Sequence, residues 1–233
     1  MSKAKKQAWV AILIMMALIL IDQWIKIYIK THFVLHESYK VTSWFYLSFV
    51  ENKGMAYGMQ LGSKALLTGF RIAAVFLFGW YLFKQIVQNQ SPWLFVVLMS
   101  MLISGALGNI IDCVFYGQWF TSSVGRVAQW ADPSVGLMPN TSWFLGPVVD
   151  MFYFPLIRFD WPEWVPATGE TVHFITDFDW PDWLPCSDEP FLFFKPVFNF
   201  ADACITVSTV SLLLYFCINT YRTTKSKKQH ADL

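Results

Sequence analysis

Two pairs of amide and carboxylate residues are the most prominent candidates for chemistry in this sequence. Asn109 and Asp112 are three residues apart at the end of one long apolar segment, and Asn199 and Asp202 are three apart at the start of another. A spacing of three places both members of a pair on one face of a helix. Ionisable groups cost roughly 2.5–3.5 kcal/mol each at the centre of a membrane helix, so those that remain there are candidates for function. Carboxylates in this setting can transfer protons to a substrate or line an ion pathway.

Other charged residues near apolar segments have a structural explanation beside a functional one. Asp22 precedes Lys26 by four residues, the favourable order for an ion pair on a helix, although the long Lys26 side chain can also extend to the membrane interface. Arg71 can likewise reach the interface or pair with an acid. Asp150 follows the apolar run 146–149, and its position alone does not separate it from a solvated or capping acid.

The elements that must position these groups are membrane helices. Of the 233 residues, 55% are apolar and 14% charged, which indicates a chain whose solvent is mostly lipid. Four segments are long enough to cross about 30 Å of hydrocarbon. The predicted spans are 9–29, 65–83, 92–111 and 198–218. Gly108 completes a stripe with Ser100 and Ser104 that lets another helix approach the third span closely. The predicted fold is therefore a membrane all-α bundle of four helices in one polytopic domain.

Charge placement predicts the orientation of this bundle. Basic residues flank the first and last spans and follow the second: Lys3, Lys5, Lys6, Lys84, Arg222, Lys225, Lys227 and Lys228. The positive-inside rule then puts both termini in the cytoplasm. Segments 30–64 and 113–197 face outward. The first is rich in strand formers over 41–59, which predicts a small extracytoplasmic sheet.

The long outward segment 113–197 is too long for a structureless connector and forms a predicted extracytoplasmic insertion. It contains a repeat, FDWPEWVP at 159–166 and FDWPDWLP at 178–185. Paired tryptophans favour an anchor at the membrane interface over a docking site for a partner. Cys113 and Cys186 share this oxidising side, but the sequence leaves open whether they form a disulfide.

Five short motifs resemble, in order, those of the lipoprotein signal peptidase family, also called signal peptidase II. The family patterns are DQxxK, NxGxAFG, GGALGNxxDR, VVDF and FNxAD. They are similar to DQWIK at 22–26, ENKGMAYG at 51–58, GALGNIID at 105–112, VVDM at 148–151 and FNFAD at 198–202. Five motifs in family order on a four-span topology make coincidence a poor explanation.

The resemblance implies a function and assigns roles to residues. The family is a group of aspartic peptidases of the bacterial inner membrane that remove signal peptides from prolipoproteins whose Cys carries diacylglycerol, cutting before that Cys. The resemblance implies that Asp150 and Asp202 are the catalytic pair. Asp150 is therefore a stronger candidate for function than its position in the sequence alone suggests. The resemblance also implies inhibition by globomycin-type cyclic peptides. The supporting and substrate-binding residues that it implies, with Arg71 added below, are Asp22, Lys26, Asn52, Gly54, Arg71, Gly108, Asn109, Asp112, Asn199 and Ala201.

Two departures from the family pattern stand out. The Arg that follows the GNxxD motif is Cys113 here, and we hypothesise that Arg71 or Arg126 supplies the missing charge. The insertion also lengthens the chain on both sides of Asp150, which suggests an enlarged lid or interfacial platform.

Other functional classes receive less support. An ion- or proton-coupled transporter is the main alternative, since intramembrane carboxylates are equally typical there, but four spans without a detectable internal repeat argue against it. A structural scaffold leaves the paired amides and carboxylates unexplained. The Cys and His residues lack metal-ligand spacing, so no metal or cofactor is expected. The net charge of +1 gives no reason to expect nucleic acid, and the remaining expected partner is membrane lipid.

Overall fold

The protein is described from a computed structural model. It describes residues 1–53, 55–56, 59–60, 64–88, 91–160, 162, 171–172, 178–179, 191–194 and 196–231. These residues divide into two compact units, which are described separately. The first unit is formed by 1–37, 49–151 and 198–233, and the second by 38–48 and 152–197.

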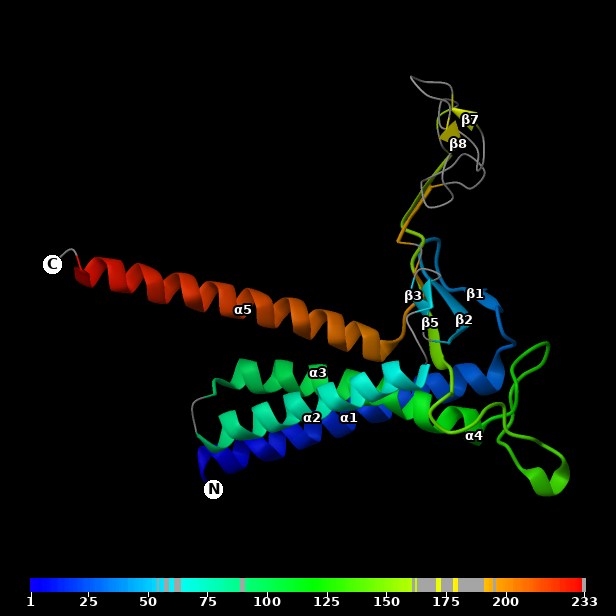
Figure 1. Cartoon of the computed structure of the whole chain (residues 1–233), viewed down its shortest axis with the longest axis horizontal. Coiled ribbons are helices and arrows are strands. Elements are labelled where there is room, and N and C mark those ends of the chain that lie inside the picture. Colours follow the sequence, from blue (N-terminus) through cyan, green and yellow to red (C-terminus); the bar gives the residue numbers. More distant parts are fainter. Residues whose placement is uncertain are drawn as a thin grey trace. The chain divides into compact units, whose positions relative to one another are not determined.

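Four long helices form the first unit (Figure 1). They are α1 (Lys3–His32), α2 (Lys64–Val87), α3 (Trp93–Ile111) and α5 (Phe200–Ala231), and α3 packs against the other three. Each is apolar and long enough to cross a membrane, with candidate spans at Lys3–His32, Lys64–Val87, Trp93–Trp119 and Phe200–Lys225. At one end of the bundle, α1 and α3 finish and α2 and α5 begin. We call this end the site end.

Small residues on α3 allow α5 to lie against it. A Cβ atom added at Gly105 would meet the Ala201 carbonyl oxygen at 2.5 Å, and one at Gly108 would meet Asp22 Oδ2 at 2.5 Å. The opposite end of the bundle is closed by a core of apolar side chains from α1, α2, α3 and α5. This core includes Ala11, Leu82, Val96, Ile103 and Leu212. The apolar end holds the helices together, while the site end contains the buried polar groups.

The chain after α3 stays helical for two more short elements before it turns back. A π-helix, η1 (Asp112–Tyr116), leads into α4 (Gly117–Trp119), and a 3-10 turn, η2 (Pro133–Val135), lies on the loop that follows. π-turns within helices occur often at functional sites, because they re-aim side chains. Here the π-turn begins at Asp112, one of the predicted site residues.

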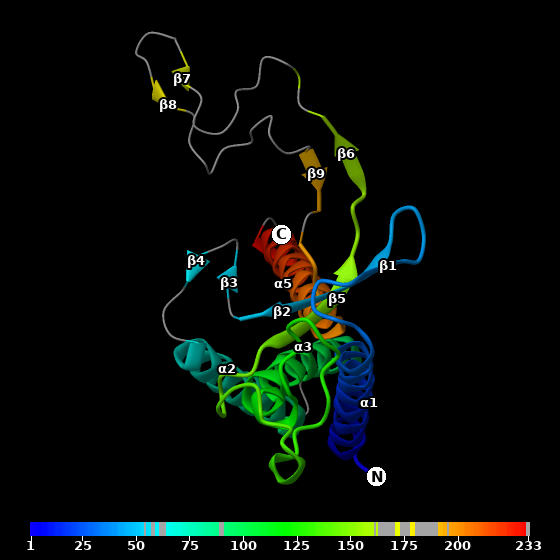
Figure 2. The ribbon, with the colours of Figure 1, turned by 90° about the vertical axis from the view of Figure 1, so that its right-hand side faces the viewer.

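A three-stranded sheet lies at the site end, in the order β1-β2-β5. Its strands are β1 (Ser38–Lys40), β2 (Tyr46–Asn52) and β5 (Val148–Tyr153), and β1 pairs antiparallel with β2 (Figure 2). The predicted sheet at 41–59 is thus present, but its third strand comes from the long insertion. Beyond β2, the short strands β3 (Met55–Ala56) and β4 (Met59–Gln60) form a separate antiparallel pair.

The second unit is built from short strands and stacked aromatic rings. Strand β6 (Ile157–Phe159) pairs antiparallel with β9 (Phe191–Phe193), and β7 (Thr171–Val172) with β8 (Phe178–Asp179). Phe154 stacks on both Phe45 and Trp44, with ring centroids 4.8 and 5.9 Å apart. Most of the Trp-Pro repeat lies outside the described residues, so the interfacial anchor stays a prediction.

The helical prediction is confirmed, with differences at the ends. The predicted spans coincide with α1, α2, α3 and α5, but α1 begins six residues earlier than predicted and α5 continues to Ala231. The lysine-rich ends, 3–6 and 222–228, are helical because nothing in them breaks a helix: they contain neither Pro nor Gly. Apolarity predicts the part of a helix that fits in lipid, and not its polar extension.

Candidate active site

A fully buried lysine joins two carboxylates at the site end. The Lys26 ammonium lies 2.9 Å from Asp22 Oδ2 and 2.9 Å from Asp112 Oδ2, and it donates to Asn109 Oδ1 at 2.9 Å. Lys26 and Asp112 are 0% exposed and Asp22 is 2% exposed. The ion pair predicted from the spacing of four is therefore present, and Lys26 does not extend to a surface. We call Asp22, Lys26 and Asp112 the lysine cluster.

Each carboxylate of the lysine cluster also holds a backbone N–H next to a predicted catalytic residue. Asp22 Oδ1 accepts from the Ala201 N–H at 3.0 Å, and Asp112 Oδ2 accepts from the Val149 N–H at 3.3 Å. Ala201 precedes Asp202, and Val149 precedes Asp150. One charged cluster thus fixes the two chain segments, far apart in sequence, that carry the candidate pair.

Gln23 completes the lysine cluster and was not predicted as a site residue. Its Nε2 lies within hydrogen-bonding distance of Asp22 Oδ2, the Gly108 carbonyl and Asp112 Oδ1, at 3.0 to 3.2 Å. Its Oε1 accepts from the hydroxyl of buried Tyr116 at 3.1 Å. Gln23 lies inside the DQWIK motif, which is the one signal that could have identified it, because an amide beside a carboxylate has no distinctive spacing of its own.

Asp202 is held by the start of α5. Asn199 Oδ1 accepts from the Asp202 N–H at 2.9 Å, and Asp202 Oδ2 accepts from the Asn199 N–H at 3.4 Å. This reciprocal pattern is a capping box, which satisfies two backbone donors at a helix N-terminus. The capping box therefore fixes the Asp202 side chain at the first turn of α5.

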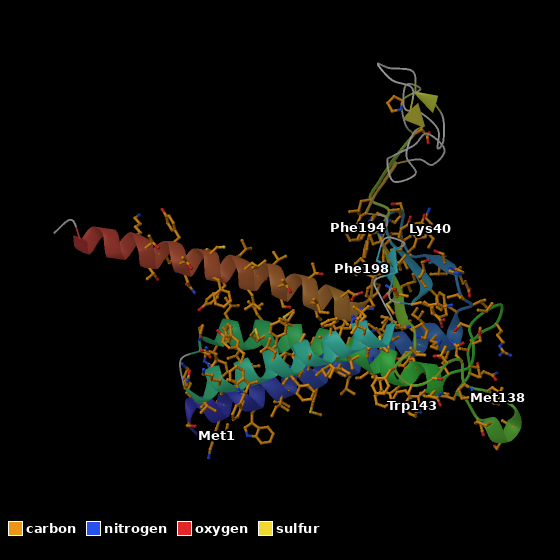
Figure 3. All side chains as sticks on the ribbon, viewed as in Figure 1. Met1, Lys40, Met138, Trp143, Phe194 and Phe198 are labelled. Atoms are coloured by element: carbon orange, nitrogen blue, oxygen red, sulfur yellow. The ribbon has the colours of Figure 1, made fainter. Side chains whose placement is uncertain are left out.

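Asp150 lies on β5, close to this helix start. The Met151 N–H donates to the carbonyl of Phe198 at 3.2 Å, which ties β5 to the residues before α5; Phe198 is labelled in Figure 3. Asp150 is 3% exposed, and burial together with the nearby negative charge of Asp202 raises the pKa of its carboxyl to about 7. The folded protein therefore keeps a proton on Asp150 near neutral pH.

Two amides connect the aspartates to each other and to the lysine cluster. Asn109 Nδ2 donates to Asp202 Oδ1 at 2.8 Å, and Asn199 Nδ2 donates to Asp150 Oδ1 at 2.7 Å. Asn199 Nδ2 also lies 3.1 Å from Asn109 Oδ1. Asn52 on β2 forms a side-chain hydrogen bond with Asp150 as well. The structure thus brings both predicted pairs, Asn109 with Asp112 and Asn199 with Asp202, into one network with Asp150.

From the sequence we hypothesised that Arg71 or Arg126 supplies the positive charge that Asp112 lacks, and the structure shows a different partner. Asp112 has its positive partner in Lys26, not in an arginine. Arg126 is exposed and donates through Nε to the Ser122 carbonyl at 3.3 Å. Arg71 donates through Nη1 to Cys113 Sγ at 3.2 Å, so its guanidinium does lie beside the position where the family pattern has arginine.

The remaining predictions on site residues have mixed outcomes. Gly108 and Ala201 lie where α3 and α5 meet, with a Cβ at Gly108 falling 3.3 Å from the Ala201 Cβ. Gly54 and Cys186 lie outside the described residues. Cys113 is a buried free thiol. Within the described part of the chain, no group of three or more His, Cys, Asp or Glu side chains could hold a metal ion.

A second buried lysine, one helical turn beyond Lys26, was missed by sequence reasoning. The Lys30 ammonium lies 2.5 Å from Glu51 Oε1, and the Ser123 hydroxyl donates to the same oxygen at 2.8 Å. Both side chains come from segments that only the fold brings to α1, namely β2 and the loop after α4. Because Glu51 precedes Asn52, this ion pair fixes the strand that reaches Asp150.

Fold and site together define a multi-pass membrane protein with a buried network of carboxylates and amides at one end of its helices. Residues 14–218 match the family described as Signal peptidase (SPase) II, and the chain belongs to that family. It is a peptidase that removes signal peptides from prolipoproteins. The transporter alternative gains no support.

Curated relatives agree with this assignment, and a solved structure shares the fold. The chain is similar to a lipoprotein signal peptidase of Porphyromonas gingivalis, with 41% identity over 210 residues, covering 90% of this chain and 84% of the relative. It is similar to a lipoprotein signal peptidase of Amoebophilus asiaticus at 30% identity, covering 90% and 78%. A bacterial membrane enzyme solved at 2.3 Å by the in meso method shares the fold, with a TM-score of 0.56 at 18% identity, covering 91% of this chain and 89% of that one.

Proposed function

We propose that the chain is an aspartic endopeptidase that cuts diacylglyceryl-modified prolipoproteins immediately before the lipidated Cys, with Asp150 and Asp202 as its catalytic pair. The observation that carries the proposal is the coupling of these two carboxyls. Each accepts a hydrogen bond from an asparagine amide, and the charge of Asp202 helps to raise the pKa of Asp150 to about 7. Two such carboxyls share one proton, which is the requirement for acid and base catalysis by a pair.

The environment of each carboxyl assigns its role. Asp202 lies at a helix N-terminus with donors on both oxygens, so it is the ionised partner and takes a proton from water as the water attacks the scissile carbonyl. Asp150 holds the shared proton and donates it to the carbonyl oxygen. When the tetrahedral intermediate collapses, Asp202 gives its proton to the departing amine, and Asp150 recovers a proton from the hydroxyl that becomes the new acid. No covalent enzyme intermediate is needed.

The orientation follows from the charged ends of the helices. Basic residues lie at the end of the bundle opposite the site end, and the positive-inside rule places that end in the cytoplasm. In a bacterial inner membrane, the site end then opens at the outer face, where water is available. The acyl chains of the substrate are lipid-like and can stay in the bilayer while the peptide bond reaches Asp150 and Asp202. Globomycin-type cyclic peptides would compete at this position.

The test is cleavage of a diacylglyceryl-modified prolipoprotein peptide by purified wild type, Asp150→Asn and Asp202→Asn proteins in detergent. We expect cleavage by the wild type alone, with a loss of about 10³-fold or more in each variant, because neither amide can exchange a proton with water or the carbonyl. The same peptide without its diacylglyceryl group is the substrate control. Cleavage that persists in either variant, with unchanged thermal unfolding, contradicts the assignment of that residue.

A further inference from the structure

A polar cavity lies beside the sheet, on the site end of the first unit. Its volume is about 310 Å³. Side chains from four segments line it, among them His36, Glu51, Lys53, Lys64, Asn140 and Thr141. Neither Asp150 nor Asp202 is among its lining residues. The loop that forms one wall also carries Met138 and Trp143, labelled in Figure 3. A volume near 300 Å³ is at the lower end of the range for small-molecule sites, sufficient for a headgroup but not for an acyl chain.

The charges around the cavity leave a positive excess. Among the described residues that line it, Glu51 is the one acid, and its carboxylate already binds Lys30 and Ser123. Lys53 and Lys64 form no ion pair within the part of the chain that the structure describes. Arg71 lies close enough to Lys64 for their charges to interact, and His36 adds a third basic group to the lining. The cavity is therefore complementary to an anion.

A neutral donor lines the same cavity. Asn140 provides an amide. An anion with several oxygens can use ammonium groups and an amide together.

The position of the cavity points to the source of the anion. Lys64 is the first residue of α2, one of the four candidate membrane helices. The end of such a helix lies at the depth of the lipid headgroups, where lysines commonly contact them. Phosphate esters are the most abundant anions at that depth.

We propose that this cavity binds a phosphate ester, supplied by the headgroup of a phospholipid. Lys53 and Lys64 neutralise the phosphate, and the Asn140 amide provides a further donor. The site is distinct from the peptidase centre and does not depend on the assignment of the catalytic pair. It would hold the start of α2 against β2, the strand that carries Asn52, at the membrane surface.

The experiment measures binding to the purified full chain in detergent through the shift of its thermal unfolding midpoint with probe concentration. The probes are dioleoyl phosphatidylglycerol, dioleoylglycerol, which has the same chains without phosphate, and soluble glycerol phosphate. The variant is Lys53→Gln/Lys64→Gln, and Lys53→Arg/Lys64→Arg keeps both charges. Lys40→Gln, which removes one exposed charge on β1 outside the cavity lining, is the matched control.

We expect phosphatidylglycerol to stabilise the wild type, the arginine variant and Lys40→Gln alike, and its apparent Kd to rise about tenfold or more in the double glutamine variant, because two charge-assisted contacts are lost. Saturation by glycerol phosphate at the same concentration would identify a soluble phosphate ester as the source. Equal affinity in the double glutamine variant, or equal binding of dioleoylglycerol, would overturn the site. Tighter binding of an acidic peptide than of either phosphate probe would replace phosphate by carboxylate.

Discussion

The lysine cluster and the proposed catalytic pair are neighbours, and each contains two carboxyls. Asp22 and Asp112 are both buried, whereas in the pair Asp150 is buried and Asp202 is half-buried. The two regions differ most in the groups that bind these carboxyls. In the lysine cluster the Lys26 ammonium lies 2.9 Å from both Asp22 and Asp112. In the catalytic pair the donors to Asp150 and Asp202 are asparagine amides and backbone N–H groups. Amides can bind a carboxylate, but they cannot cancel its charge.

This difference separates structure from chemistry. A cation between two carboxylates offsets the cost of burying them, and Asp22 and Asp112 serve as fixed acceptors for the backbone N–H groups of Ala201 and Val149. Without a cation, two close carboxyls retain a proton, and that proton is available for transfer. The lysine cluster holds the segments that carry Asp150 and Asp202, and these two residues are the proposed site of the chemistry. Each prediction below changes either the lysine cluster or the pair and tests whether the two regions differ in this way.

The largest effect is expected from removing the cation. Lys26→Met leaves Asp22 and Asp112 as buried charges without their partner, and breaking a buried ion pair from one side costs about 3–5 kcal/mol. The free energy of unfolding, from denaturant titration in micelles, should fall by that amount, with loss of cleavage. The triple variant Lys26→Met/Asp22→Asn/Asp112→Asn should recover part of the stability. Equal stability of Lys26→Met and wild type would show that the cluster does not depend on the cation.

A smaller steric effect is expected where the cluster meets α3. A methyl group in Gly108→Ala would lie 2.5 Å from Asp22 Oδ2, so Asp22 must move and loosen its hold on the Ala201 N–H. We expect a loss of about 1–3 kcal/mol in the free energy of unfolding, together with slower cleavage. Gly79→Ala on α2 is the matched control, because its added Cβ meets nothing within 4 Å. If both variants unfold at the same temperature, the close approach at Gly108 has no consequence.

The sequence predicted the lysine cluster better than the catalytic pair. Spacing alone gave the Asp22–Lys26 ion pair, because both residues lie on one helix, where sequence distance determines spatial distance. Asp150 was assigned only through family resemblance, since its neighbours Asn199 and Asp202 are about fifty residues away along the chain and meet it only after the strand and helix have packed. The local spacing of residues in the sequence cannot predict that contact.

The same limit explains what was missed. Lys30 has its partner on β2, and the third strand of the sheet comes from an insertion that gave no strand signal of its own. From the sequence, a charged residue such as Lys30 in the last turn of an apolar helix is expected to extend to the membrane interface. Lys30 is buried instead because Glu51 and Ser123, from other segments of the chain, bind its ammonium group. By contrast, the helices themselves were predictable, because lipid imposes a length and an apolar composition on each one.

The Asn109 amide links the lysine cluster to the pair, and removing it should slow cleavage. Asn109 accepts from Lys26 and donates to Asp202 Oδ1 at 2.8 Å. In Asn109→Ala, Asp202 loses a donor, and hydrogen bonds to charged groups contribute about 1.5–3 kcal/mol, so cleavage should slow by about ten- to a hundredfold. Asn219→Ala, farther along α5, should cleave at the wild-type rate. An unchanged kcat with a lower free energy of unfolding would show that Asn109 only stabilises the lysine cluster.

The effect spread over the widest range of conditions is a slope in stability with pH, and it comes from the uncompensated pair. Because the pKa of Asp150 is raised to about 7 in the folded protein, against an ordinary value near 4 when unfolded, unfolding releases this proton between those two values. The stabilisation is complete below about pH 4 and is lost as the pH rises to about 7, with a slope of at most about 1.4 kcal/mol per pH unit. Asp150→Asn should lose the share of this slope that comes from Asp150, and the difference between its unfolding curve and that of the wild type measures that share. Cleavage by the wild type should fall above about pH 7, where Asp150 loses the proton that it donates. A slope in Asp150→Asn equal to that of the wild type would mean that Asp150 does not hold this proton.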